Sequence, residues 1–242
     1  MNKDNVDVLG IIPARGGSKG IPRKNLALLG GRPLIWHAIV QAKEAKLLDK
    51  FIVSTDDDEI AEVARTSGAD VPFLRPKELA TDSATDIQFL RHAVGWLKDH
   101  RGWEPTIVVT LQPTCPFRTS SDIDNVIRII QRPGVDSVRT IVNASPNNPY
   151  KMWKHVGNDG EIEPIIRTNH FDRIGTDIPR QSLPDYYLQV GVVYGTKTEF
   201  IKQDRILGDK VIGYEIPANR FIDIDVPEDL VRANELLAAL KQ

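Results

Sequence analysis

The chain has 242 residues, of which 41% are hydrophobic and 26% are charged. This composition indicates a folded globular protein and excludes a mainly disordered one. The formal net charge is −2, so the chain lacks the bulk positive charge that is typical of nucleic-acid-binding proteins.

The single cysteine, Cys115, excludes an intramolecular disulfide and any metal site built from several cysteines. Residues 1–7 lack the charged-then-apolar order of a secretory signal, and no apolar run approaches the roughly 20 residues of a membrane span. We therefore expect a cytoplasmic protein, with neither a membrane nor a nucleic acid as its partner. The five histidines also lack the spacing of a zinc site.

Apolar runs alternate with amphipathic stretches through the first part of the chain. Short runs rich in Val, Ile and Leu predict buried strands at residues 6–13, 51–53, 71–74, 106–111 and 136–142. Apolar residues at helical spacing predict intervening helices around residues 34–42, 60–68, 89–97 and 122–131. This alternation predicts an α/β fold, with a Rossmann-like, mixed but mainly parallel sheet flanked by helices.

The pattern changes at residues 143–187, which are rich in Pro, Asn, Asp and Gly. Asn158-Asp159-Gly160 predicts a hairpin turn there. We interpret this stretch as a β-rich insertion in a lid or subunit contact, because irregular segments this long are usually functional. Further strands are expected at residues 188–194, 211–216 and 221–226, followed by a helix at 227–240. We predict one domain over residues 1–242.

A glycine-rich loop at residues 14–20, Ala-Arg-Gly-Gly-Ser-Lys-Gly, follows the first predicted strand. Glycine lets main-chain N–H groups approach an anion, and Arg15 and Lys19 add two positive charges. At the carboxyl edge of a parallel sheet such a loop suits a triphosphate. It matches neither the dinucleotide fingerprint nor the P-loop. A solvated basic turn is the alternative.

Two aspartates, Asp223 and Asp225, fall in the last predicted strand. Alternation along a strand places them on one face and Ile222, Ile224 and Val226 on the packed face. Two carboxylates on one face suit a hard cation such as Mg²⁺. The alternative is that Asp225 caps the following helix.

The run Asp56-Asp57-Asp58 offers a competing metal site. It also directly precedes a predicted helix, where acidic side chains satisfy free N–H groups and interact with the helix dipole. We therefore favour helix capping for these three residues.

Residues 12–25 read Ile-Pro-Ala-Arg-Gly-Gly-Ser-Lys-Gly-Ile-Pro-Arg-Lys-Asn, which resembles the signature of the acylneuraminate (CMP-sialic acid or nonulosonate) cytidylyltransferases. The resemblance continues over nearly the whole chain, at residues 54–57, 74–82, 111–114, 179–181 and 222–225. It implies the nucleotide-diphospho-sugar transferase type of fold. The family members are homodimers whose insertion reaches the neighbouring subunit's site.

The resemblance also implies an activity. Family members transfer CMP from CTP to the anomeric hydroxyl of an acidic nine-carbon sugar, a nonulosonic acid, with Mg²⁺ as cofactor and pyrophosphate as product. The residues that match the family's nucleotide site are Arg15, Gly16, Gly17, Ser18, Lys19, Asn25, Arg75 and Gln112. Those that match catalytic groups are Arg15, Lys19, Asp223 and Asp225, with the two aspartates as metal ligands.

On the sugar side the expected contacts are Gln112, Arg180, Gln181 and Gln189, with Arg167 and Arg173 as weaker candidates. Here the chain departs from some relatives, because Leu188 and Val190 stand where those have Arg and Asn. A legionaminate-, pseudaminate- or deaminated-neuraminate-type sugar therefore stays open.

Cys115 replaces a small hydroxyl residue of the family. We interpret it as a packed side chain and not as a nucleophile, since no histidine is paired with it. The nearest alternative function is that of a CMP-Kdo (3-deoxy-manno-octulosonate) synthetase. The others are a nicotinamide-dependent oxidoreductase, disfavoured by the missing fingerprint, and a catalytically silent nucleotide-binding protein.

Overall fold

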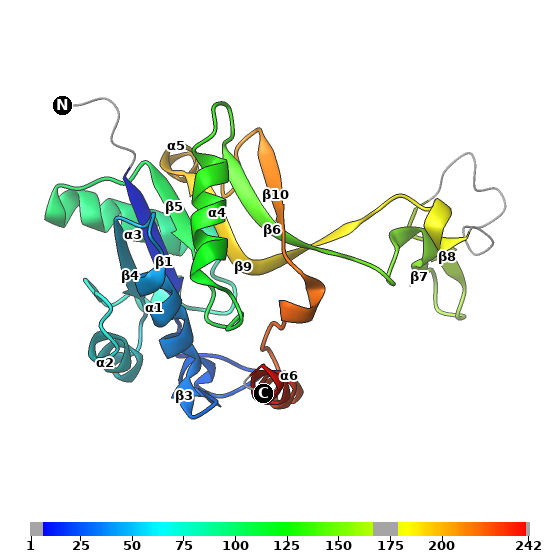
Figure 1. Cartoon of the computed structure of the whole chain (residues 1–242), viewed down its shortest axis with the longest axis horizontal. Coiled ribbons are helices and arrows are strands. Elements are labelled where there is room, and N and C mark those ends of the chain that lie inside the picture. The colour runs from blue at the N-terminus through cyan, green and yellow to red at the C-terminus, as the bar shows by residue number, and fades with distance from the viewer. Residues whose placement is uncertain (1–6, 167–178, 241–242) are drawn as a thin grey trace.

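The computed structural model of the chain describes residues 7–166 and 179–240. Its centre is a six-stranded sheet in the order β10-β6-β9-β5-β1-β4 (Figure 1). The strands are β1 (Val8–Pro13), β4 (Lys50–Ser54), β5 (Ile107–Thr110), β6 (Ser137–Asn143), β9 (Tyr187–Lys197) and β10 (Val211–Glu215). Strand β9 runs antiparallel to β5 and β6, whereas the other neighbours are parallel. The predicted mixed, mainly parallel sheet is confirmed.

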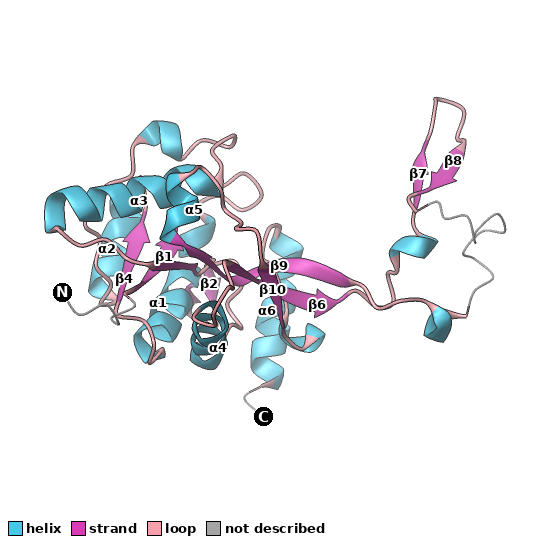
Figure 2. Cartoon of the chain, turned by 90° about the horizontal axis from the view of Figure 1, so that it is seen from above, coloured by secondary structure: helices cyan, strands magenta, loops and turns pink. Residues whose placement is uncertain are grey.

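Helices cover both faces of this sheet (Figure 2). They are α1 (Leu34–Glu44), α2 (Asp58–Thr66), α3 (Asp86–Arg101), α4 (Ser120–Ile130), α5 (Thr198–Lys202) and α6 (Pro227–Ala239). Over the described part of the chain, none of these helices combines the length and the apolar character needed to cross a membrane.

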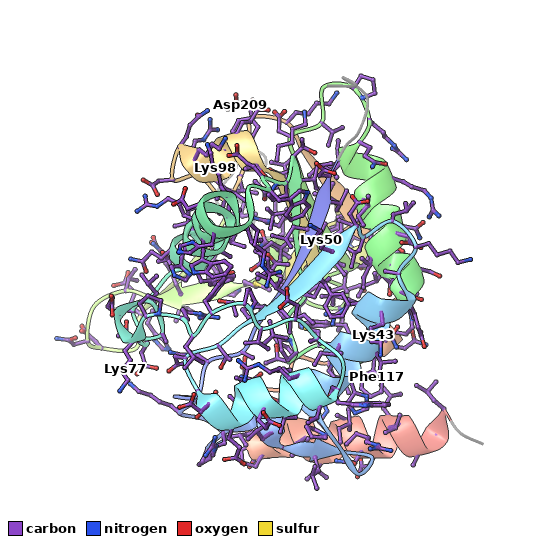
Figure 3. All side chains as sticks on the ribbon, turned by 90° about the vertical axis from the view of Figure 1, so that its left-hand side faces the viewer. Lys43, Lys50, Lys77, Lys98, Phe117 and Asp209 are labelled. Carbon is purple, nitrogen blue, oxygen red and sulfur yellow. The ribbon has the colours of Figure 1, made fainter. Side chains whose placement is uncertain are left out.

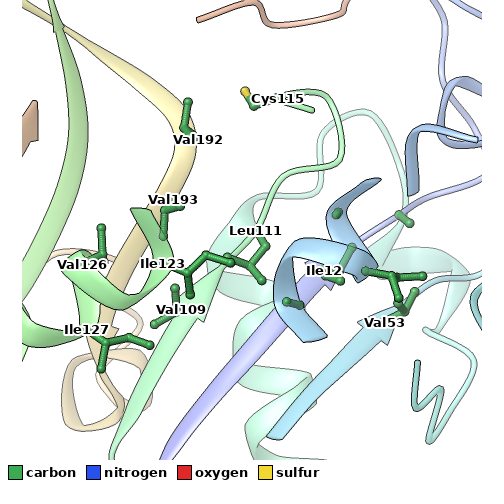
Figure 4. Packing of buried hydrophobic residues seen from close by; sticks show 14 of the residues in the cluster. Ile12, Val53, Val109, Leu111, Cys115, Ile123, Val126, Ile127, Val192 and Val193 are labelled. Atoms are coloured by element: carbon green, nitrogen blue, oxygen red, sulfur yellow. The ribbon is translucent and has the colours of Figure 1, made fainter. Parts of the chain in front are cut away.

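Strand β1 explains the two-sided core, because its side chains alternate between the two faces. Val8 and Ile12 pack into the cluster formed with α1 and α4, whereas Leu9 and Ile11 pack into the cluster formed with α3. Figure 4 shows Ile12 in the first cluster, which continues to Ile123 of α4. Burying one such aliphatic side chain contributes about 1.5–3 kcal/mol.

A third apolar cluster joins segments that are distant in sequence. Ile21, which directly follows the glycine-rich loop, packs with Leu34 of α1, with Ile224 before α6 and with Ala233 of α6. Phe117, labelled in Figure 3, packs against the same cluster. This cluster places the loop next to the predicted aspartate pair.

The strand predicted at residues 71–74 is wrong. Only two isolated bridges are formed here: Asp70 pairs with Ile52 of β4, and Leu74 pairs with Thr55, which follows β4. The reason is Pro72, which has no N–H to donate to a sheet ladder.

The described residues between β6 and β9, 144–166 and 179–186, form an arm that projects away from the sheet (Figures 1 and 2). It contains a two-stranded antiparallel hairpin of β7 (Trp153–His155) and β8 (Ile162–Pro164), so the predicted turn at residues 158–160 is confirmed. The minor elements of the chain are β2 (Leu28–Leu29), β3 (Arg32–Pro33), η1 (Lys24–Leu26), η2 (Lys77–Leu79), η3 (Pro149–Lys151), η4 (Arg180–Ser182) and η5 (Ala218–Arg220).

The buried carboxylate of Asp124 ties α4 to the loop after α1, because it accepts hydrogen bonds from the N–H groups of Lys46 and Leu47 at 2.9 and 3.0 Å. We expect Asp124→Ala to lower the free energy of unfolding by about 2–3 kcal/mol. Asp159→Ala, on the exposed hairpin turn, should change it by less than about 0.5 kcal/mol. Urea denaturation measures both, and equal midpoints would contradict this account.

Candidate active site

A cavity of about 610 Å³ opens where β1 and β5 reach their carboxyl ends. Its walls come from the end of β1, the glycine-rich loop, residues 24–25, residues 75–89, residues 112–114, Gly191 of β9 and residues 223–225. Ligands of open α/β sheets bind at this edge. The position of the cavity therefore agrees with the expected nucleotide site.

Most predicted nucleotide and metal residues line this one cavity. They are Arg15, Ser18, Lys19, Asn25, Arg75, Gln112, Asp223 and Asp225. Gly16 and Gly17 do not line it. The N–H of Gly16 instead donates to Asp56 Oδ1 at 2.9 Å, which holds the loop to the end of β4.

The two cations of the loop are paired with Asp82 on the opposite wall. Arg15 Nη1 lies 3.0 Å from Asp82 Oδ1, and Lys19 Nζ lies 2.6 Å from Asp82 Oδ2. The hydrogen bond from Lys19 lowers the pKa of Asp82, so this carboxyl is ionised at neutral pH. Because such exposed pairs are weak, an incoming polyphosphate can take over both cations at little cost.

The loop also touches the segment that carries the aspartates. A Cβ added to Gly20 would lie 2.1 Å from the main-chain oxygen of Asp225. Lys24 Nζ donates to Asp225 Oδ1 at 2.6 Å. Asn25 is buried, and its Nδ2 donates to the carbonyl of Arg15 at 3.0 Å. These contacts fix the distance between the cationic and the anionic walls.

The strand predicted at residues 221–226 is wrong, although both aspartates line the cavity. Ile224 is fully buried as expected, but Val226 is 44% exposed and does not face the packed side. The physical reason is that Asp229 Oδ2 accepts from the N–H groups of Asp225 and Val226, at 3.0 and 3.1 Å. Asp229, and not Asp225, thereby caps the start of α6.

The two aspartates have different surroundings. Asp223 Oδ1 is buried without a hydrogen-bond partner in the described part of the chain, whereas Asp225 is exposed and paired with Lys24. A buried oxygen without a donor suits a bound cation. Over residues 7–166 and 179–240 no three acidic, His or Cys side chains form a metal cluster. Mg²⁺ fits such a site, since one or two carboxylates plus substrate phosphates usually bind it.

Arg75 lines the cavity as a buried donor whose guanidinium is held by neighbouring groups. It is 5% exposed, its Nε donates to Ser54 Oγ at 3.0 Å, and its Nη2 donates to the Ser54 carbonyl. The guanidinium also lies over the ring of Phe89, 4.9 Å from its centroid. Burial lowers the pKa of Arg75 to about 10, so the group stays charged at neutral pH.

A model of the family described as "Cytidylyltransferase" matches residues 9–158, which is more than half of the chain. The chain belongs to the cytidylyltransferase family. The resemblance read from the sequence is thereby confirmed.

Two relatives and one solved structure show how far the similarity reaches. The chain is 30% identical to the CMP-N,N'-diacetyllegionaminic acid synthase of Legionella pneumophila, over 95% of this chain and 96% of that protein. It is 28% identical to the N-acylneuraminate cytidylyltransferase of Escherichia coli O18:K1:H7, over 90% of this chain. The chain spans about half of that second relative, 49% of its length.

The fold is shared with a CMP:2-keto-3-deoxy-manno-octonic acid synthetase complexed with CTP. The TM-score is 0.71 and the identity 17%, with 97% of this chain and 99% of that chain covered. At this identity the likeness concerns the fold alone.

The free cysteine of this cytidylyltransferase, Cys115, is 2% exposed. Burial, and then the nearby carboxylate of Asp223, raise the pKa of its thiol far above the usual value. The thiol therefore stays protonated, and the prediction that it is a packed side chain is confirmed.

Among the expected sugar contacts whose side chains the structure describes, only Gln112 lies at the cavity. Arg180 and Gln181 belong to η4 on the projecting arm, and Gln189 is an exposed residue of β9. Neither Gln181 nor Gln189 lines the cavity of its own chain. Arg167 and Arg173 lie outside the described residues.

The capping interpretation of Asp56, Asp57 and Asp58 is confirmed for Asp57, whose Oδ1 accepts from the N–H groups of Glu59 and Ile60 of α2 at 3.0 and 2.9 Å. Sequence reasoning missed Asp82 and Asp86, which also line the cavity. Asp82 stands in a stretch that carries the family resemblance, which was an available signal. Asp86 had no signal beyond its place at the start of a helix.

Substituting Gly20 tests the contact between the two walls. We expect Gly20→Ala to weaken CTP binding by at least about tenfold, because the added Cβ must push the loop away from residue 225. Gly17→Ala is the matched control, since its Cβ meets nothing within 4 Å. Titration calorimetry measures both, and equal affinities for the two variants would refute the contact's role.

Proposed function

We propose that this protein transfers CMP from CTP to the anomeric hydroxyl of a nonulosonic acid and releases pyrophosphate. The observation that carries the proposal is the gathering of Arg15 and Lys19 with Asp223 and Asp225 around one cavity. A cavity that brings cations and carboxylates together suits a triphosphate and a divalent ion. The names of the two relatives support a nonulosonic acid as the acceptor.

In the proposed reaction the anomeric oxygen of the sugar attacks the α-phosphorus of CTP. A bond forms between that oxygen and phosphorus, the bond to the bridging oxygen breaks, and pyrophosphate leaves. The hydroxyl proton is released to solvent. Arg15 and Lys19 leave Asp82 to hold the outer phosphates and stabilise the charge that accumulates on pyrophosphate. Catalysis thus comes mainly from positioning and charge neutralisation.

Asp223 and Asp225 would hold the magnesium ion. When bound, Mg²⁺ supplies Lewis-acid stabilisation of negative charge on the phosphates. Asp223 brings its unpartnered Oδ1, and Asp225 gives up its ion pair with Lys24. Arg75 is proposed to recognise cytosine, because its held guanidinium presents donors in a fixed direction.

A CMP-Kdo synthetase is the second candidate, and the shared fold with a CTP-bound enzyme of that class supports it. The two candidates share the nucleotide and differ in the acidic sugar. We favour the nonulosonic acid because the sequence similarity over most of the chain is to proteins named for such sugars.

We further propose a homodimer in which each arm contributes to the neighbour's cavity. The arm exposes the apolar side chains of Ile162 and Ile165, and the adjoining start of β9 exposes that of Leu188; they are 49%, 52% and 56% exposed. Exposed apolar groups in one region indicate a contact surface. The expected sugar residues of η4 lie on the same arm. Light scattering, which measures the molar mass in solution, tests the dimer. The cytoplasmic location stays a prediction from the sequence.

Removing one carboxylate tests the metal site. We expect Asp223→Asn and Asp225→Asn each to lower kcat at least about 100-fold, because the cation loses a ligand. The melting temperature should stay close to that of the wild type. Asp58→Asn, an exposed residue of α2, is the control and should keep full turnover. Wild-type rates in either site variant would remove the metal assignment.

The loop cation tests the nucleotide site. Arg15→Ala should raise KM for CTP about tenfold or more and change KM for the sugar less than about threefold, because only the phosphates contact this guanidinium. Steady-state kinetics with each substrate varied in turn measure the difference. Equal changes for both substrates would count against the assignment.

The activity itself is tested by pyrophosphate release with CTP, Mg²⁺ and a panel of acidic sugars. The panel contains N-acetylneuraminate, legionaminate- and pseudaminate-type sugars and 3-deoxy-manno-octulosonate. We expect turnover with a nonulosonic acid. Turnover with only the eight-carbon sugar would favour the second candidate, and no turnover with any sugar would overturn the proposed function.

A further inference from the structure

Three polar side chains form a hydrogen-bonded chain along one wall of the cavity. Asp86 is the first residue of α3, Tyr194 lies on β9, and Gln112 follows β5. The Tyr194 hydroxyl donates to Asp86 Oδ2, and Gln112 Nε2 lies 3.3 Å from Tyr194 Oη. Asp86 and Gln112 line the cavity, whereas Tyr194 is 7% exposed behind them.

Counting protons sets the orientation of the Gln112 amide. Burial, and then the Asp86 carboxylate, raise the pKa of Tyr194 far above its usual value, so the phenol keeps its single proton. That proton goes to a carboxylate, which only accepts. The phenol oxygen can therefore only accept from Gln112, and the amide must turn its NH₂ group toward Tyr194. Oxygen and nitrogen of the amide are thus distinguished by chemistry.

The tyrosine in this chain is firmly held. The guanidinium of Arg139 lies over its ring, 4.5 Å from the centroid, and Arg139 Nη2 donates to the Ile206 carbonyl at 2.9 Å. On the other side of Gln112 stands Gly191, where an added Cβ would lie 3.5 Å from Gln112 Cγ. Gly191 and Gln112 both line the cavity, so a ligand there can reach the Gln112 side chain, while Tyr194 behind it is held by Asp86 and Arg139.

We propose that Tyr194, anchored by Asp86, is a positioning residue that aims Gln112 Oε1 at a hydroxyl group of the acidic sugar. This inference rests on the proposed function and adds a specificity device to it. No described group donates a hydrogen bond to Gln112 Oε1, so the oxygen is available to a ligand. A site that holds a polar group ready for a hydroxyl rejects analogues that lack it.

The protein contains a matched control for this arrangement. Asn125 Nδ2 lies 3.1 Å from Tyr214 Oη, and the Tyr214 hydroxyl donates to Asp122 Oδ1 at 2.9 Å. This is the same order of amide, phenol and carboxylate. None of its three residues lines the cavity.

The test compares Tyr194→Phe with Tyr214→Phe in the full-length protein. We expect Tyr194→Phe to raise KM for the sugar about tenfold and to leave KM for CTP within about twofold, because only the aim of Gln112 is lost. Tyr214→Phe should leave both KM values within about twofold. Melting temperatures show that both variants are folded. A rise in both KM values for Tyr194→Phe would indicate general damage and overturn the proposal.

A double-mutant cycle then separates positioning from packing. In a Gln112→Ala background, Tyr194→Phe should change the sugar KM less than about twofold, because the group that it aims is already absent. The same rise in both backgrounds would overturn the proposal while the wild type stays active. A wild type without turnover on any sugar would overturn the proposed function and this inference together.

Discussion

The charges of the cavity are held in place by pairing with one another. Arg15 and Lys19 share Asp82, and Lys24 holds Asp225. Among these described groups, only Asp223 has a buried side-chain oxygen without a hydrogen-bond partner. Opposite charges can stand this close in the free protein because each is neutralised locally. A ligand that brings both phosphates and a divalent ion takes over Arg15, Lys19 and Asp225 in place of their present partners, Asp82 and Lys24.

This arrangement depends on the sheet edge and on one small apolar cluster. The carboxyl ends of β1 and β5 bring the glycine-rich loop and Gln112 together, as parallel strands do in α/β folds. Ile21 and Ile224 pack in the same cluster and carry the aspartate segment against the loop. Packing of distant apolar residues thus places the aspartate segment against the loop, and the hydrogen bonds of Lys24 and Asn25 then fix the distance between cations and carboxylates.

Much of this was predictable from the sequence, and the failures have local causes. Alternating apolar runs predicted the sheet, and the glycine-rich loop with its cations predicted the cavity. The strand predicted at residues 221–226 is absent because the Asp229 carboxylate accepts from the N–H groups of Asp225 and Val226, which a sheet would need for its hydrogen bonds. The hydrogen-bonded chain of Asp86, Tyr194 and Gln112 could not be predicted from the sequence, because its two contacts join residues that are 108 and 82 positions apart. Only the folded sheet brings such residues together.

The most direct test of the central claim is a crystal structure with CTP and Mn²⁺ in place of Mg²⁺. The account predicts anomalous density for Mn²⁺ between Asp223, Asp225 and the phosphates, with Arg15 and Lys19 moved from Asp82 to the phosphates. Anomalous density elsewhere, or the two cations still paired with Asp82 beside a bound triphosphate, would contradict it.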